Sequence, residues 1–493
     1  MKALLLVFAL VGYAALGQPI YKSSEVEKPA DPSGSAVALN QFIAANLQIP
    51  IKSAAKGLNG GVSVKGIIEP DGSMSSLTVV RSLDSLTDRE ALRILGLYRA
   101  WQPAMLNGKA VRQEATYPVF FRTARLPNFD FATNTIVEYF DKDHRPTADP
   151  AAYEYRSVIP VDERGSVRAE VTYERNRKGI WKTVTTIPYQ KTEEWVWLAT
   201  DTGPDSVRAF GMSAREQDLN SSSETVTVQA DGKLLSMVAA IGTGKMPYSS
   251  KHYYKSGMLR EEMKMVDSTR FLTSWHDNGQ LHSLTEVNEK KGTAIREVYD
   301  RSGNRLVEAG NGWAVLTGTP IYYKNVYEQG QVTNACKTGR WTGKFADSTL
   351  LYEEWYEAGV LKKGIAHING QPVAYQNEFM TDAQFPGPDG KMDMYRFLGQ
   401  NIRYPIEAAR NNVTGRVLIT LLVHEDGHSS DYQIAHSADK RLDAEALRVV
   451  KLMNGKWQPA QFKGRPVQSR FSLPIGFNVE SSGMNVRTFG VPR

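Results

Sequence analysis

The chain has 493 residues, of which 41% are hydrophobic and 23% are charged, and its formal net charge is +6. This balance is typical of globular proteins, and the length suits about three domains. The basic excess is small, and no Lys/Arg-rich run with interleaved aromatic residues occurs, so the sequence does not indicate a nucleic-acid partner. The single cysteine, Cys336, excludes an internal disulfide, and we interpret it as an inert thiol.

The N-terminus predicts export. Lys2 precedes an apolar run over residues 3–15, and the small residues Ala15 and Gly17 lie at its end. This pattern indicates a secretory signal peptide over residues 1–17. The alternative is an uncleaved anchor, but the run is shorter than the about 20 apolar residues that a spanning helix needs. We expect an exported protein of the periplasm or cell envelope, with no spanning segment after cleavage, and a linker over residues 18–36.

Residues 37–124 predict a small α+β domain. Two apolar runs flank Asp71-Gly72, and Asp-Gly between such runs is a strong hairpin signal. Apolar residues spaced by three and four then predict a helix around residues 88–95, which ends before Trp101-Gln102-Pro103 because Pro cannot continue a helix. A last strand follows over residues 111–121. The economical arrangement is one three-stranded antiparallel sheet with helices.

The middle region, residues 125–380, is rich in aromatic and β-branched residues and predicts an all-β segment. An aromatic residue stands four positions before a Gly at Tyr253/Gly257, Trp275/Gly279, Tyr299/Gly303 and Trp355/Gly359. This spacing predicts repeated hairpins whose turns require positive φ. The region resembles the MORN-like, YwqK-type antitoxin repeats, which form elongated antiparallel sheets. The alternative is an ordinary β-rich domain with Gly turns.

The first domain occurs a second time after a hinge over residues 381–394. Residues 395–480 repeat the order of motifs with an offset of 355 residues, as in Gly60 and Gly415 or Glu90 and Glu445, and of 356 from Trp101 and Trp457 onward. An internal duplication therefore brackets the middle region. Residues 481–493 predict a polar tail.

Several shared motifs carry a resemblance to the TonB C-terminal domain family. They are Tyr-Pro before the sheet, Gly-x-Val in the first strand, Asp-Gly in the hairpin, Glu-Ala-Leu-Arg in the helix, Trp-Gln-Pro-Ala, and Pro-x-x-Phe in the last strand. The second copy has all of them, and the first has Ile49 in place of the Tyr. Full transducers of that family also have a membrane anchor and a Pro-rich spacer. We find neither, so we expect no coupling to an inner-membrane motor in the family's usual way.

The resemblance implies that the last strand of each sheet lies at an edge and captures an extended peptide of an outer-membrane receptor or another envelope protein. The implied peptide-binding residues are Gln113, Ala115, Tyr117, Val119, Phe121, Gln468, Ser469, Arg470, Phe471, Leu473 and Ile475. The alternative is that these edges are blocked, by pairing between the two domains, by a homodimer through the edge strands, or by the middle sheet.

One catalytic motif occurs, and we reject it. His424-Glu425-Asp426-Gly427-His428 spells the H-E-x-x-H of zinc proteases, which need both imidazoles on one helix face. Here the motif straddles the Asp-Gly hairpin. We expect no enzyme, metal or cofactor. Glu90 and Glu445 are explained by the helix dipole, and Trp101 and Trp457 by core packing, with ligand stacking as the alternative.

Two functions remain from the sequence. The first is an exported, periplasmic, energy transducer-like protein that binds envelope proteins and is linked to transmembrane transport. The second is a structural or cell-surface scaffold, built on the hairpin repeats, without a transport role.

Overall fold

A computed structural model describes residues 19–214, 222–241, 247–321, 323–376, 381–385, 394–480 and 483–487. The chain divides into two compact units. The first comprises Met1–Leu198, Asp205–Leu316 and Gln331–Cys336, and the second comprises Ala199–Pro204, Thr317–Gly330 and Lys337–Arg493. The predicted signal peptide and most of the predicted hinge lie outside the described residues. We describe each unit by itself.

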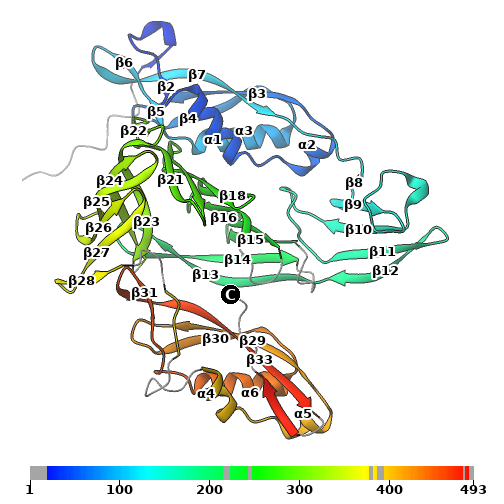
Figure 1. The fold of residues 1–493 in the computed structure, drawn as a ribbon. Coiled ribbons are helices and arrows are strands. Elements are labelled where there is room, and N and C mark those ends of the chain that lie inside the picture. The colour runs from blue at the N-terminus through cyan, green and yellow to red at the C-terminus, as the bar shows by residue number, and fades with distance from the viewer. Residues whose placement is uncertain are drawn as a thin grey trace, which may run out of the picture. The chain divides into compact units, whose positions relative to one another are not determined.

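The first end domain, residues 37–124, packs three helices on one face of an antiparallel sheet (Figure 1). Its helices are α1 (Ala36–Asn46), α2 (Ile51–Ala55) and α3 (Ser85–Leu97), and its strands are β3 (Gly60–Ile68), β4 (Met74–Arg81), β5 (Trp101–Gln102), β6 (Ala104–Leu106) and β7 (Lys109–Phe121). The Asp84 carboxylate accepts a hydrogen bond from Thr87 N–H and caps α3. The three predicted strands are present, and β3 is the central one.

The predicted linker over residues 18–36 is folded, which corrects the expectation. It contains β1 (Ile20–Tyr21), the 3-10 helix η1 (Ser23–Glu25) and β2 (Asp31–Pro32). β1 adds to β7 in parallel, and β2 pairs with β5. These pairings satisfy backbone groups of the domain, so the segment belongs to the domain rather than to a spacer.

The middle region is all-β, as its composition predicts. A five-stranded sheet contains β8 (Phe129–Asp130), β9 (Thr135–Phe140), β10 (Tyr155–Pro160), β11 (Val171–Arg177) and β12 (Ile180–Ile187), with η2 (Pro150–Ala152) between β9 and β10. Further strands follow, and β13 to β23 are hydrogen-bonded neighbours in sequence order. Those up to β23 are β13 (Tyr189–Ala199), β14 (Pro204–Ala214), β15 (Ser222–Gln229), β16 (Leu234–Ile241), β17 (Pro247–Tyr253), β18 (Leu259–Val266), β19 (Thr269–Trp275), β20 (Leu281–Asn288), β21 (Gly292–Tyr299), β22 (Arg305–Glu308) and β23 (Asn311–Ile321).

The predicted glycine turns are turns in the structure. Gly257, Gly279, Gly303 and Gly359 have φ between +81° and +94°, and each lies in a tight connection between antiparallel strands. Of the four aromatic residues of the pattern, Tyr253 and Trp275 are buried and Tyr299 and Trp355 are partly buried. Hairpin repetition is therefore observed, while the MORN-like resemblance stays a prediction.

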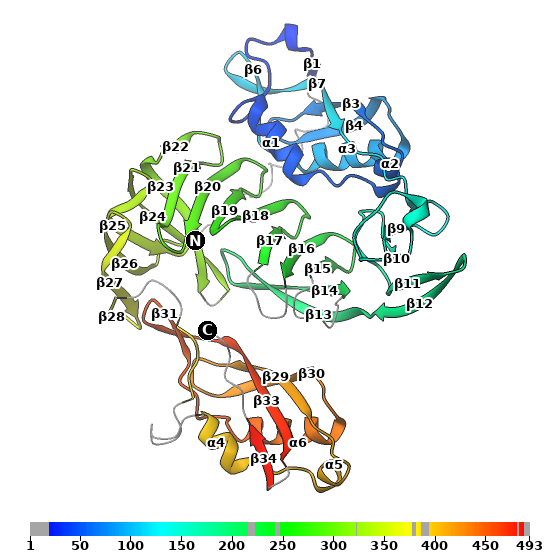
Figure 2. The ribbon, with the colours of Figure 1, turned by 45° about the vertical axis from the view of Figure 1, so that its right-hand side comes forward.

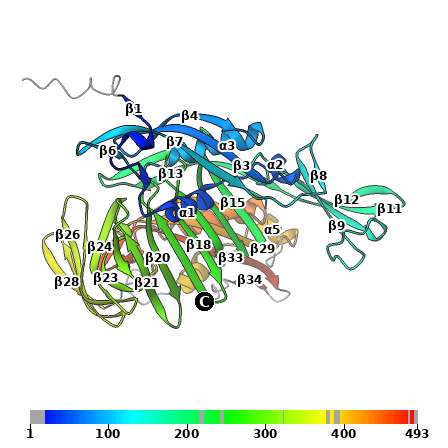
Figure 3. The same cartoon turned by 90° about the horizontal axis from the view of Figure 1, so that it is seen from above.

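Within the first unit, the end domain and the hairpin strands share one hydrophobic core. Phe42 and Tyr98 of the domain pack in the same cluster as Tyr253, Trp275 and other residues of the strands. Figure 3 shows β15, β18, β20 and β21 side by side beneath α1. The Asn46 side chain accepts the Leu259 N–H at 2.7 Å in this buried contact. The domain is thus fixed to the strands by packing and by a satisfied buried polar group.

The second unit contains the second end domain and, apart from Gln331–Cys336, the remaining strands of the middle region. The strands are β24 (Lys324–Thr333), β25 (Cys336–Lys344), β26 (Leu350–Glu357), β27 (Val360–Ile368) and β28 (Gln371–Tyr375). The domain contains α4 (Met394–Asn401), α5 (Ile406–Arg410), α6 (Lys440–Lys451), β29 (Gly415–Val423), β30 (Ser429–His436), β31 (Ala460–Phe462), β32 (Arg465–Val467), β33 (Ser469–Glu480) and β34 (Gly483–Arg487). Its sheet has the order β30-β29-β33-β34.

The predicted polar tail, residues 481–493, contains β34, which corrects the expectation. β34 pairs antiparallel with β33, from Gly476↔Arg487 to Glu480↔Gly483. The three predicted strands of the second domain are β30, β29 and β33, and β34 is a fourth (Figure 2).

Candidate functional site

The H-E-x-x-H motif lies on the β29–β30 hairpin, as predicted. His424 N–H donates to the His428 carbonyl at 2.8 Å, and Gly427 N–H donates back to the His424 carbonyl at 3.0 Å. The His424 ring contacts the Ser430 hydroxyl at 2.7 Å, whereas the His428 side chain is exposed beside Asp426. The two imidazoles have different partners. Among the described residues, no three His, Cys, Asp or Glu side chains are grouped to hold a metal ion.

The predicted capture strand of the first domain is β7, and a short part of its outer margin is already paired. β1 pairs with Arg112 and Gln113 on the side opposite β3, whereas β6 pairs with Lys109–Val111 before the β3 ladder begins. From Thr116 to Phe121 the described residues supply no further strand on this side. In the second domain the situation is reversed, because β34 covers β33 from Gly476 to Glu480 and leaves Ser469 to Ile475 uncovered among the described strands.

The register shows which backbone groups face the open margins. In an antiparallel ladder, successive residues direct their N–H and C=O alternately to the two sides. The His424–His428 bond places the even-numbered residues of that end of β29 toward β30, so odd-numbered residues face β33. Their partners on β33 are also odd-numbered, as in Leu421↔Phe471. In the first domain, the Glu69 N–H to Ser73 carbonyl bond directs the odd-numbered residues of β3 toward β4, so the even-numbered residues face β7. Their partners on β7 are odd-numbered, as in Val64↔Tyr117.

Most of the predicted binding residues therefore bond to their own sheet. Val119, Phe121, Leu473 and Ile475 are buried in the two domain cores. The odd-numbered members of the predicted set direct their backbone to the neighbouring strand: Gln113, Ala115, Tyr117, Val119, Phe121, Ser469, Phe471, Leu473 and Ile475. Only Arg470 directs its backbone outward within β33, while Gln468 precedes the strand.

The groups that face outward belong to the even-numbered neighbours. In the first domain these are Thr116 and Phe120, and the Phe120 side chain is 62% exposed. In the second domain they are Arg470 and Ser472, both exposed. Pro118 and Pro474 lie at outward positions too, which agrees with the rule that a strand tolerates Pro where its missing N–H would point off the ladder. These prolines were the signal in the sequence that could have indicated which residues direct their backbone groups outward.

The opposite margins of the two sheets are distorted by bulges. Register shifts interrupt β3–β4 and β29–β30 at equivalent places, and the bulge residues Ser76 and Asp431 have φ of +51° and +49°. Bulges twist an edge and hinder further pairing. The Asp431 carboxylate also binds the Arg470 guanidinium at 2.7 Å. The margins of β4 and β30 are thus less suited to strand addition than those of β7 and β33.

The repeated Glu-Ala-Leu-Arg motif joins two helices. The Glu90 carboxylate accepts the Gln48 N–H at 2.6 Å, and Arg93 binds both Glu90 and the Asn46 carbonyl. In the second copy, the Glu445 carboxylate accepts the Arg403 N–H at 2.6 Å in the same way. Glu90 is buried, so hydrogen bonds at the end of the preceding helix, and not the dipole alone, explain the recurrent Glu.

Trp101 and Trp457 are core residues, as predicted. They are 3% and 5% exposed and lie in the hydrophobic cores of their domains. Trp101 contacts Tyr117 with ring centroids 4.9 Å apart, and Trp457 contacts Phe471 at 4.8 Å. Each indole fills the space between the last helix and the last strand, which leaves no face for a stacked ligand.

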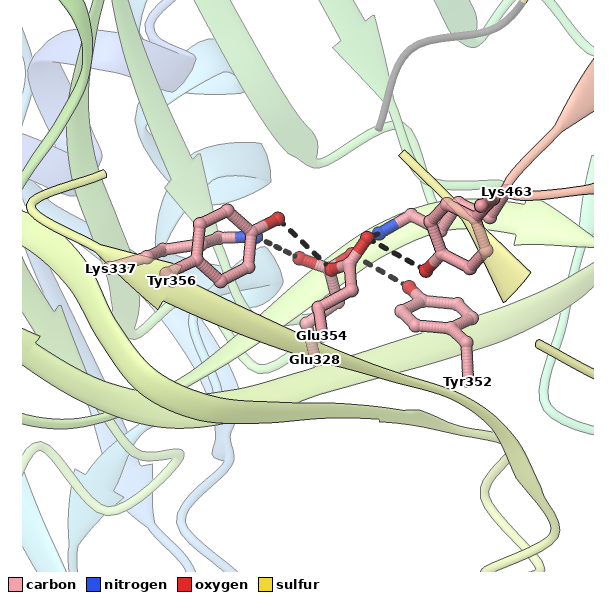
Figure 4. Close-up of polar contacts among 7 residues, drawn as sticks. Glu328, Lys337, Tyr352, Glu354, Tyr356 and Lys463 are labelled. Atoms are coloured by element: carbon pink, nitrogen blue, oxygen red, sulfur yellow. Dashed lines mark hydrogen bonds and ion pairs between the residues drawn. The ribbon is translucent and has the colours of Figure 1, made fainter. Parts of the chain in front are cut away.

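A buried charge cluster in the second unit was not predicted. Lys463, on the β31–β32 turn, is 4% exposed and lies 2.8 Å from Glu354 and 3.0 Å from Glu328 (Figure 4). Lys337 binds Glu328 at 2.8 Å from the other side. The hydroxyl groups of Tyr352, Tyr356 and Tyr375 donate to the two carboxylates. Two carboxylates and two ammonium groups balance, so the cluster carries no net charge.

The lysines keep Glu328 ionised. Burial alone would raise the pKa of Glu328, but the ammonium groups of Lys337 and Lys463 and the Tyr352 hydroxyl hold it well below its usual value of 4.5. Because every charge has partners, the cluster fixes the hairpin of the second end domain to strands β24 and β26. We interpret it as an anchor for the domain and not as a reactive site.

The comparisons with known proteins agree with the geometry of the end domains. The family model described as Gram-negative bacterial TonB protein C-terminal matches residues 45–123 and residues 400–479. No curated protein matches the chain. In the described part of the chain, no helix has the length and apolar character needed to cross a membrane. The chain therefore contains two segments similar to the TonB C-terminal domain, which is a domain of the Gram-negative cell envelope.

Proposed function

We propose that the protein is exported and that its end domains capture extended peptides by adding them as a strand to the open parts of β7 and β33. The peptides come from outer-membrane receptors or other envelope proteins, and the capture links the protein to TonB-dependent transport. The function makes and breaks no covalent bond and needs no cofactor.

The main support for the proposal is the set of outward-facing backbone groups on either side of Pro118 in β7 and before Pro474 in β33. Thr116 and Phe120, and likewise Arg470 and Ser472, are exposed and direct their N–H and C=O away from the existing ladder. Such groups bind an extended peptide through its main chain, while its alternate side chains set preference. Natural sheets usually protect open edges, so two open stretches at equivalent strands favour use by a partner.

The open stretches are short, and their length limits the binding affinity that we expect. Among the described strands, none pairs with two outward-facing residues of each margin, and the margin offers their N–H and C=O plus one proline carbonyl. A net contribution of about 0.5–1.5 kcal/mol per hydrogen bond gives only modest affinity from the backbone. Side-chain contacts, for example with the exposed Phe120, must therefore contribute to selection.

The test is the binding of synthetic peptides, with the sequences of plug segments of outer-membrane receptors, to the purified chain by fluorescence anisotropy. Ser472→Pro removes an outward N–H and leaves the β29 ladder intact, so it should weaken binding to the second domain about tenfold. Thr116→Pro is the matching change in the first domain. Pro474→Ala adds an outward donor and should bind at least as tightly as the wild type.

A proline at Ser469 or Phe471 would instead remove a bond to β29 and is not a clean test. Wild-type affinity in the Ser472→Pro, Thr116→Pro double variant would contradict strand addition. The absence of binding by any such peptide, with the chain folded, would favour the scaffold function.

A further inference from the structure

The chain's own strand β34 occupies the C-terminal half of the β33 margin. The alternation that directs Pro474 outward also directs Gly476, Asn478 and Glu480 outward, and these are the residues opposite β34. Figure 2 shows β34 alongside β33 at the edge of the sheet. β34 therefore binds the same kind of backbone groups that an incoming peptide would bind.

The first domain shows that the fold does not need a strand at this place. Phe120 is equivalent to Gly476, and at Phe120 the described residues supply no pairing strand. The two domains otherwise share helices, register and even the bulges at Ser76 and Asp431. β34 is thus an addition to a sheet that is already complete.

The pairing of β34 is weak enough to be displaced. The three residue pairs that face each other, such as Asn478↔Asn485, supply about six backbone hydrogen bonds, and each of these replaces a bond to water. Ordering the five residues of β34 costs conformational entropy of a size similar to the net gain from these bonds. The two amounts nearly cancel, so a competing strand with a few favourable side-chain contacts can replace β34.

We propose that β34 is an intramolecular competitor that covers part of the capture margin and is displaced by the extended peptide. This regulation rests on the proposed function, because it concerns the same margin of β33. It defines the partner further: the peptide must be long enough to pair from Arg470 past Pro474 to Glu480, and it must outcompete a tethered strand.

The test uses the peptide of residues 481–493 as the probe and a chain that ends at Glu480. The shortened chain should bind the labelled peptide, and the full chain should bind it at least about tenfold more weakly, because its tethered copy has a high effective concentration. Two peptide variants provide a matched control. Asn485 N–H faces β33 and Val486 N–H faces away, so Asn485→Pro should abolish binding and Val486→Pro should retain it.

The same substitutions in the full chain give a test that does not depend on correct folding of the shortened chain. Asn485→Pro in the full chain should increase binding of the wild-type 481–493 peptide, whereas Val486→Pro should not. Failure of the shortened chain to bind the peptide, or equal effects of the two prolines, would overturn the competitor role.

Receptor-derived peptides separate this inference from the proposed function. Equal binding of a receptor peptide to full and shortened chains would support capture and refute competition. If the shortened chain binds the 481–493 peptide but binds no receptor peptide, the result would support the displaceable strand and refute capture of receptors.

Discussion

Lys463 and Glu354 form an ion pair at 2.8 Å in which the side chains are only 4% and 1% exposed. Lys463 has φ +49°, at the turn position that Asn107 occupies in the first copy. Asn is well suited to this conformation, and a long side chain is not. The strained turn is therefore offset by the contacts of the ammonium group with two buried carboxylates.

Lys463→Met should strongly destabilise the second unit. The change leaves Glu354 buried without its cation, and breaking one partner of a buried pair costs about 3–5 kcal/mol. Urea unfolding followed by tryptophan fluorescence measures the loss. Lys65→Met is the matched control, because Lys65 pairs with Glu114 where both side chains are about 40% exposed and the expected cost is below about 1 kcal/mol.

The double variant Lys463→Met, Glu354→Gln tests whether the unpaired buried charge causes the loss of stability. Removal of both charges should restore part of the lost stability, because no unpaired charge is then buried. A double variant that is less stable than Lys463→Met would show that packing of the lysine stem, and not its charge, holds the hairpin.

Gly279→Ala should destabilise the first unit more than Gly292→Ala. Both glycines have positive φ, +94° and +78°, so both substitutions carry the about 1–2 kcal/mol conformational cost. A methyl group at position 279 would also lie 2.9 Å from a Tyr98 ring atom and 3.0 Å from Phe42, whereas position 292 is open. The difference between the two midpoints of thermal unfolding isolates the contact of the end domain with the hairpin strands. Equal midpoints would contradict that contact.

Glu90→Ala should cost about 1–3 kcal/mol, because the partly buried Gln48 N–H and the Arg93 guanidinium lose their acceptor. Glu90→Gln keeps one acceptor oxygen and should cost less. Glu445→Ala is the equivalent change in the second copy, where Arg403 N–H is exposed to water, and should be milder. Equal effects of Glu90→Ala and Glu90→Gln would indicate that only the charge matters.

The sequence predicts the parts of the fold that are local. Asp-Gly hairpins, glycine turns and the helix before Trp-Gln-Pro-Ala each depend on neighbouring residues, and the duplication confirms them internally. Residues 18–36 and β34 were missed because their order comes from pairing with distant strands, as in Ile20↔Arg112, and short polar segments carry little periodicity. The direction of the backbone at Arg470 or Thr116 requires the register, although Pro118 and Pro474 indicate it. Burial of Lys463 depends on β24 and β26, which are far away in sequence, and has no local signal.

Acidification should destabilise the first unit through His282. Burial and the neighbouring His276 lower the pKa of His282 to about 4, whereas an unfolded His titrates near 6.5. The unfolded state therefore binds the proton more readily, so the contribution of His282 is complete above about pH 6.5 and is lost as the pH falls toward 4. The loss of unfolding free energy is on the order of 3 kcal/mol.

Urea midpoints measured from pH 7.5 to pH 4.5 should fall for the wild type and fall less steeply for His282→Gln. His428→Gln, at a side chain that is 64% exposed, should keep the wild-type slope. Parallel slopes for wild type and His282→Gln would show that other groups determine the acid sensitivity.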